Sequence, residues 1–250
     1  MIDSHTHLHI CAPPDTELVT EAHAAGVTKM LTVGTDVSSS RVALEAAALY
    51  GGVFAAVGIH PNAAAGYDDA HHAALLELAA DPLCRAVGET GLDFYREGAP
   101  REDQERAFRA QIEIARAVDK PLVIHTREAD TATLAILEAE TAGVKVILHC
   151  FSMPDRIEAC LAHPDWWLSF AGNVTYPANA GLRAAAIRVP AERLLVETDA
   201  PYLTPVPKRG TPNAPARVRL TAEAVALERR VPYADFDAGV EAAAAAAFGW

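Results

Sequence analysis

Six residues of metal-binding type follow short apolar runs along this chain. Four are histidines and two are acids, and each stands where an apolar run stops: His5, His7, Glu89, His125, His149 and Asp199. Imidazole nitrogens and carboxylate oxygens are common protein ligands for divalent cations. The recurrence at equivalent places predicts one site for a pair of ions, because any single histidine or acid would more often be structural.

The spacing of these residues supports the same prediction. His5 and His7 lie two residues apart, and alternate side chains of a strand share a face, so both can hold one ion. Glu89 ends an apolar run, where an unpaired carboxylate is costly, and a carboxylate can bridge two cations. Asp199 can bind a metal and accept a proton from water. Glu89 and Asp199 are therefore the predicted catalytic carboxylates.

Two further residues are candidate substrate contacts. His60 ends the third apolar run, where it could be a seventh ligand, orient a ligand or touch substrate, and the last two roles are favoured. Arg127 follows His125 by two residues and offers a bidentate fork to phosphate. A salt bridge from Arg127 to Glu128 or Asp130 is an almost equally good interpretation.

Other polar residues receive plainer interpretations. Asp93 and Tyr95 are expected on the loop above Glu89, where they would shape the pocket. The five remaining histidines are expected to be solvated surface groups: His9, His23, His71, His72 and His163. The four cysteines have no paired spacing, which predicts reduced, buried thiols in a cytosolic protein: Cys11, Cys84, Cys150 and Cys160.

Eight apolar runs alternate with helical segments along the chain. The predicted strands are 2–8, 29–34, 53–59, 86–89, 121–125, 145–149, 167–170 and 194–197. The predicted helices are 15–25, 39–49, 68–80, 101–118, 130–142, 154–162, 178–187, 217–228 and 233–247.

This alternation predicts an α/β fold, a single (β/α)8 TIM barrel with the metal site at the carboxyl ends of its strands. An open doubly wound sheet also alternates, but it usually has fewer strands and a glycine-rich first turn, which is missing here. No linker, repeat or charge block divides the chain, so residues 1–250 are expected to form one domain.

Composition narrows the function. The chain of 250 residues is 51% hydrophobic and has neither a secretory signal pattern nor an apolar run of membrane-spanning length, so it is expected to be cytoplasmic, without membrane contact or an evident obligate protein partner. Its net charge of −12 disfavours extended non-specific binding to nucleic acid. Two cations, two carboxylates and a hydroxide would still leave the site at about +1, so an anionic substrate is admissible.

The stretch from 200 to 216 is the longest irregular segment expected. It holds five prolines, which exclude helix interiors and favour extended backbone. Four cations and no acid occur between 200 and 222, and they are Lys208, Arg209, Arg217 and Arg219. A solubilising surface loop and an anion-steering loop are equally good interpretations.

The motifs together resemble the TatD-type metal-dependent hydrolases, a family of deoxyribonucleases. The matching segments, in order across residues 3 to 215, are DSHTHLH, VGIHP, VGETGLDFYRE, LVIHTREA, ILHCFS and ETDAPYLTPVPKRGTPNAP. The resemblance implies a TIM barrel, two divalent ions held by the six residues above, and hydrolysis of DNA, usually as an exonuclease on single strands. One departure is the alanine-rich stretch 243–248, which lacks the asparagine common in the family.

Three functions are weighed. The first is a 3′-5′ exonuclease that cleaves phosphodiester bonds at single-stranded DNA ends through water activated by two metals. The ions could be Zn, Mn, Mg, Ni or Co, and four histidines favour transition metals. The second is an amidohydrolase-like enzyme for an amide, lactone or aminoacyl ester, although Glu89 occupies the place where many such enzymes carry a carboxylated lysine. The third is a metal-binding interaction protein without turnover.

Overall fold

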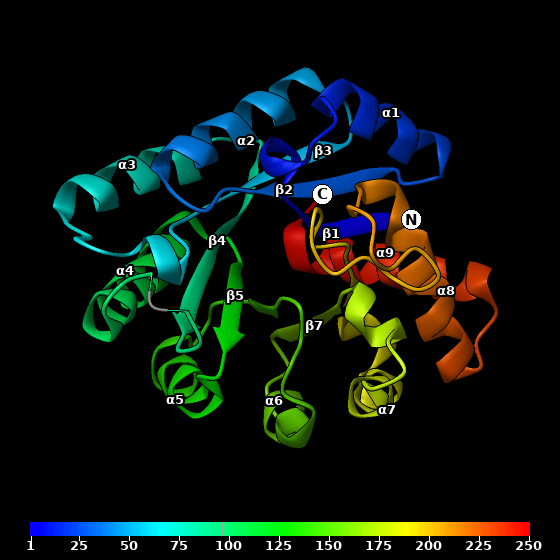
Figure 1. Ribbon diagram of the computed structural model, residues 1–250. Helices are drawn as coiled ribbons and strands as arrows, with labels where there is room; N and C mark the ends of the chain where they lie inside the picture. Colours follow the sequence, from blue (N-terminus) through cyan, green and yellow to red (C-terminus); the bar gives the residue numbers. More distant parts are fainter. Residues whose placement is uncertain (97) are drawn as a thin grey trace.

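The computed structural model describes residues 1–96 and 98–250, in which eight parallel strands form one sheet in sequence order. Figure 1 shows the strands at the centre and helices around them. The strands are β1 (Ile2–Thr6), β2 (Lys29–Val33), β3 (Val53–Val57), β4 (Cys84–Asp93), β5 (Leu122–Arg127), β6 (Val146–Leu148), β7 (Trp166–Phe170) and β8 (Leu194–Val196). The predicted (β/α)8 barrel is confirmed.

The helices alternate with the strands as predicted. They are α1 (Asp15–Ala24), α2 (Val37–Leu49), α3 (Asp69–Ala79), α4 (Arg101–Val118), α5 (Asp130–Glu140), α6 (Ile157–Leu161), α7 (Ala180–Arg188), α8 (Val218–Arg229) and α9 (Tyr233–Phe248). The strands are buried almost throughout because helices cover the sheet from outside. Among the residues described, no helix is both long and apolar enough to cross a membrane.

The helix α9 packs at the amino-terminal end of the barrel. The amino group of Met1, which precedes β1, lies 2.8 Å from the carboxylate of Glu241. Lys145, which precedes β6, donates from Nζ to the Ala246 carbonyl at 2.6 Å. This end of the barrel is therefore covered, whereas the loops at the carboxyl ends of the strands surround the predicted site.

The barrel closes between β1 and the residues that follow β8. The Asp199 N–H donates to the His5 carbonyl, and the His7 N–H donates to the Ala200 carbonyl, both at 2.9 Å. Within the wall, the buried Asp3 carboxylate accepts from the Thr198 hydroxyl at 2.6 Å and from the Thr198 N–H at 2.8 Å. The closing hydrogen bonds thus involve three residues of the predicted metal site.

The strand β4 is longer than predicted, and this corrects two expectations. Glu89 lies in the middle of β4, and Asp93 is its last residue instead of part of a loop. The additional length pairs with β5 through Thr90 to Asp93. Two glycines permit it: Gly88 and Gly91 have φ of 137° and 135°, which other residues rarely adopt. In sequence-based prediction such glycines indicate a turn, which is why the strand was expected to end at Glu89.

Candidate metal centre

The structure brings all six predicted ligands together around the Glu89 carboxylate. Oε2 of Glu89 lies 3.5 Å from Nε2 of His5 and 3.6 Å from Nε2 of His7. Oδ1 of Asp199 lies 3.6 Å from Nε2 of His7 and 3.9 Å from that of His5. The ligand atoms of His5, His7 and Asp199 lie within 4.8 Å of one another, which is close enough to share an ion.

The other oxygen of Glu89 faces a second group. Oε1 lies 2.8 Å from Nδ1 of His125 and 3.2 Å from Nε2 of His149. The ligand atoms of Glu89, His125 and His149 also lie within 4.8 Å of one another. Glu89 therefore presents one oxygen to each of two ligand groups.

Hydrogen bonds to the outer ring nitrogens determine which nitrogen of two histidines is free for a metal. Nδ1 of His7 lies 2.8 Å from the Val33 carbonyl, and Nδ1 of His149 lies 2.9 Å from Oε1 of Glu197. Both partners are acceptors, so in the neutral ring Nδ1 carries the proton and Nε2 keeps its lone pair. Each Nε2 points toward Glu89. This arrangement fits metal ligation, in which an outer acceptor fixes the tautomer.

The electrostatics of the site favour a cation. Burial opposes ionisation of Glu89, yet the imidazole of His149 and hydrogen bonds from His125 and His149 hold the pKa of Glu89 well below its usual range. Burial also lowers the pKa of His5 to about 4, and the His149 imidazole adds to this effect. An ionised carboxylate beside a neutral imidazole is the donor set that a divalent cation requires.

Unused donor atoms provide a second test of fit. Nδ1 of His5 is buried and has no hydrogen-bond partner among the described residues, and Nε2 of His125 has only Oδ2 of Asp93 nearby, at 3.4 Å. The rings of His5 and His149 stack with centroids 3.8 Å apart. Four imidazoles and two carboxylates held this closely fit divalent cations, and their nitrogen content suits transition metals.

His60 differs from the predicted ligands in its tautomer. Its Nδ1 accepts a hydrogen bond from the Asn62 N–H at 3.0 Å, so in the neutral ring Nε2 carries the proton. That Nε2 lies 3.6 Å from Oε1 of Glu89. Burial lowers the pKa of His60 to about 3, which keeps the ring neutral. His60 is thus a hydrogen-bond donor directed at the site, which argues against a seventh ligand.

Glu197 and Asp93 are partners of the ligands that sequence reasoning did not assign. Glu197 is fully buried, and its Oε1 also accepts the Cys150 N–H at 2.7 Å. Oδ2 of Asp93 lies 3.4 Å from Nε2 of His125. A glutamate inside the apolar run 194–197 was the available signal, because a buried carboxylate needs such partners.

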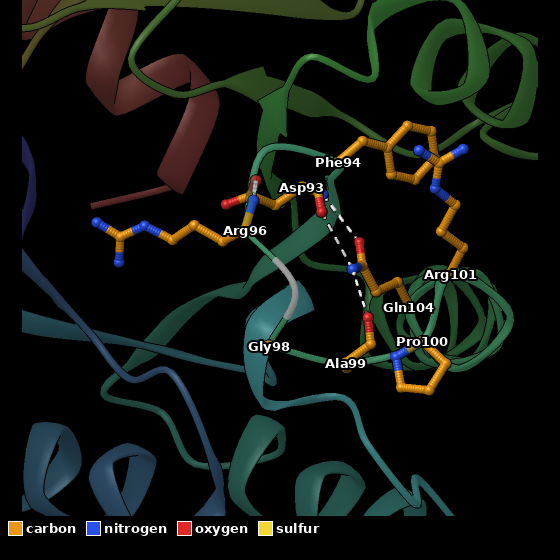
Figure 2. A pocket seen from close by; sticks show the side chains of 8 residues that line it. All are labelled: Asp93, Phe94, Arg96, Gly98, Ala99, Pro100, Arg101 and Gln104. Atoms are coloured by element: carbon orange, nitrogen blue, oxygen red, sulfur yellow. Dashed lines mark hydrogen bonds between the residues drawn. The ribbon is translucent and has the colours of Figure 1, made fainter.

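Asp93 also organises the loop after β4, as Figure 2 shows. Its Oδ1 accepts the N–H groups of Tyr95 and Arg96 at 3.0 and 2.9 Å. The Gln104 side chain accepts the Asp93 N–H and donates to the carbonyls of Asp93 and Ala99. Asp93, Arg96, Ala99 and Gln104 line a cavity of about 370 Å³ beside the site. The expectation that Asp93 shapes its surroundings is consistent with this geometry, although it does so from the strand end.

Arg127 takes neither salt bridge considered for it. Among the residues described, no acidic oxygen lies within the 4.0 Å of an ion pair with Arg127. Its guanidinium carbon lies 3.8 Å from the centroid of the Tyr95 ring, and both side chains are exposed. Arg127 therefore stacks on an aromatic ring, and in the described part of the chain its N–H groups have no acidic partner.

The remaining histidines are less exposed than expected. His23 is exposed, and the other four, which are His9, His71, His72 and His163, are half-buried at the surface. The ring of His163 stacks on Trp166 with centroids 4.0 Å apart. The cysteines are free as expected, but only Cys84 and Cys160 are buried.

Comparisons with known proteins agree with this geometry. The model of the family described as TatD related DNase matches residues 2–249. The uncharacterized metal-dependent hydrolase TatD of Mycobacterium tuberculosis is 43% identical over 235 residues, covering 90% of this chain and 89% of the relative. The 3′-5′ ssDNA/RNA exonuclease TatD of Escherichia fergusonii is 38% identical over 192 residues, covering 76% and 74%.

A solved structure gives the same fold. The TatD homologue YJJV of Escherichia coli K12 superposes with a TM-score of 0.90 at 25% identity, covering 100% of this chain and 98% of that one. A barrel with clustered histidines and acids at its mouth defines the class of metal-dependent hydrolases. Within that class, the chain belongs to the TatD related DNase family, as its motifs predicted.

Proposed function

We propose that the enzyme is a deoxyribonuclease that removes nucleotides from the 3′ ends of single-stranded DNA. The observation that carries the proposal is the Glu89 carboxylate, which turns one oxygen to each of two ligand groups. Two cations, one held by each ligand group, would stabilise the attacking and the leaving oxygen of a phosphodiester. The name of the Escherichia fergusonii relative supports the same substrate class.

The proposed ligands divide into two sets that share Glu89. His5, His7 and Asp199 would hold one ion, and His125 and His149 would hold the other. When bound, the ions lower the pKa of a water and offset negative charge on the phosphate. Asp199 orients the attacking water and accepts its proton. The residue is placed for this role because its backbone N–H is fixed to the His5 carbonyl.

The proposed substrate contacts follow from hydrogen-bonding capacity. His60 donates its Nε2 proton to a phosphoryl oxygen, because the Asn62 N–H leaves it no other tautomer when neutral. Arg127 offers its free guanidinium to the phosphate of the neighbouring nucleotide. The neutral hydrogen-bond donor His60 and the permanently charged Arg127 together favour a phosphate substrate over an uncharged ester or amide.

The test is removal of metals by chelation followed by add-back of Zn²⁺, Mn²⁺, Co²⁺ or Mg²⁺ with a single-stranded 20-mer. We expect mononucleotides released from the 3′ end, and turnover about 10²- to 10⁴-fold lower in Asp199→Asn. Asp235→Asn, at an exposed residue of α9 at the opposite end of the barrel, should retain full turnover. Undiminished turnover in Asp199→Asn would refute the assigned role.

The same assay addresses the second candidate substrate class. Cleavage of amide, lactone or aminoacyl ester substrates, with no release of nucleotides under any metal, would replace the nuclease proposal with an amidohydrolase-like activity. Membership of a hydrolase family leaves the third hypothesis, a protein without turnover, with the least support.

A further inference from the structure

We infer that the mouth of the barrel carries a binding path for a single strand of nucleic acid, formed by three tyrosines and three cations around the metal centre. The path residues are Tyr95, Tyr176, Tyr202, Arg127, Lys208 and Arg209. The inference rests on the proposed nuclease function and specifies how the strand is held beyond the scissile phosphate.

Tyr202 is the path residue nearest the metal centre. Its ring centroid lies 6.4 Å from that of the proposed ligand His7, yet 51% of the residue is exposed. The Tyr202 N–H donates to the Asp199 carbonyl at 2.8 Å, so the turn that positions the carboxylate also positions the ring. An exposed aromatic face beside a phosphodiester site is a stacking surface for the base or sugar of the terminal nucleotide.

A second aromatic surface lies on the neighbouring loop after β7. The Tyr176 hydroxyl donates to the Thr204 carbonyl at 3.1 Å, which fixes the ring against the loop that follows β8. The Arg209 guanidinium carbon lies 4.4 Å from the centroid of this ring. Stacking of Arg209 on Tyr176 presents a flat cationic surface, which suits both a base and a phosphate.

The cations after β8 divide into two kinds. Arg217 donates to the Thr211 hydroxyl and the Pro212 carbonyl, and Arg219 pairs with Glu223 at 2.8 Å. In contrast, the exposed side chains of Lys208 and Arg209 have no acidic partner within 4.0 Å in the described part of the chain. The structure thus separates Arg217, which binds within the loop, and Arg219, which pairs within α8, from two cations without an acidic partner in the described residues.

The third surface stands across the mouth. Tyr95, 57% exposed, follows β4 and stacks with Arg127 at the end of β5. In a closed barrel of eight strands in sequence order, β4 and β8 lie on opposite sides. Stacking surfaces therefore stand on both sides of the metal centre, as a strand crossing the mouth requires.

This combination selects single-stranded nucleic acid as the occupant. Bases in a single strand expose their faces to tyrosine and arginine, whereas a duplex keeps its bases stacked on one another. The three path cations are confined to the barrel mouth, while the chain as a whole has a net charge of −12. They therefore attract a few phosphates near the site without holding a long polyanion.

The experiment measures binding of fluorescein-labelled dT10 in EDTA by fluorescence anisotropy. Tyr202→Ala should weaken binding about 5- to 150-fold, the loss expected for one stacked base, and Tyr202→Trp should restore it. The double variant Lys208→Ala and Arg209→Ala should reduce the slope of log affinity against log salt by about 1.4, because each phosphate contact on a single strand contributes about 0.7. Arg219→Ala, a matched control on a paired cation, should leave affinity and slope unchanged.

The outcomes separate the two proposals. Equal dT10 affinity for wild type and Tyr202→Ala, an unchanged salt slope in the double variant, or no dT10 binding by the wild type would each overturn the path. Binding that responds to the variants as expected, without nucleotide release under any added metal, would keep the path and reject the nuclease activity.

Discussion

At the scale of single residues, the hydrogen bonds of the ring nitrogens assign the roles of the histidines. In their neutral forms, His7 and His149 donate from Nδ1 to acceptors and so present an unprotonated Nε2, whereas His60 accepts at Nδ1 and presents a proton. The sequence predicted all three near the site, since each follows an apolar run. It could not predict their tautomers, because the partners come from other strands or from the turn geometry.

Glu197 provides a test of this assignment. Glu197→Gln keeps the shape of the side chain but removes the charge that holds the Nδ1 proton of His149. We expect metal affinity to fall by about 10- to 100-fold, the usual effect of losing such a partner. Competition with a chelator measures the metal affinity, and Glu223→Gln, at an exposed residue of α8, is the control. Unchanged affinity would mean that Glu197 has only a packing role.

At the scale of elements, most strands and helices follow from hydrophobic periodicity, and β4 is the main exception. The run 86–89 was predicted to stop at Glu89, yet the strand continues to Asp93. A Cβ on Gly91 would lie 2.0 Å from the His125 carbonyl oxygen, so only glycine allows β4 and β5 to approach this closely. Such a close approach depends on tertiary contact and is invisible to local propensity.

Two glycine substitutions should therefore have opposite effects. Gly91→Ala combines a positive φ with a clash against backbone, so the free energy of unfolding should fall by at least about 2 kcal/mol. Gly239→Ala, within α9, meets no atom within 4 Å, and the higher helix propensity of alanine should raise the same free energy by up to about 1 kcal/mol. Urea unfolding of both variants measures the difference. Equal stabilities would contradict the close-approach account.

At the scale of the whole molecule, closure of the barrel and assembly of the site are one event. The backbone hydrogen bonds between β1 and the segment after β8 join His5 to Asp199 and His7 to Ala200. Ligands almost 200 positions apart in the chain thus meet only when the first and last strands meet. The number of apolar runs in the sequence predicted the barrel. The hydrogen bond between Asp3 and Thr198, which supports the closure, was not predicted.

The threonine at this closure allows a matched comparison. Thr198→Val keeps the side-chain shape but removes the hydroxyl that donates to Asp3, leaving a buried carboxylate with one donor fewer. The free energy of unfolding should fall by about 1–3 kcal/mol, the usual cost of leaving a buried polar group short of a hydrogen-bond partner. Thr221→Val is the control, because the buried Thr221 hydroxyl has no partner within the described residues.

The control should be neutral or raise stability by up to about 1 kcal/mol, since valine removes an unsatisfied polar group. Urea unfolding of the two variants gives the comparison, and chelator competition then reports on the site. If closure and site assembly are coupled, Thr198→Val should also weaken metal binding, while Thr221→Val leaves it unchanged. Loss of stability in Thr198→Val with wild-type metal affinity would show that the ligands hold their positions independently of the closure.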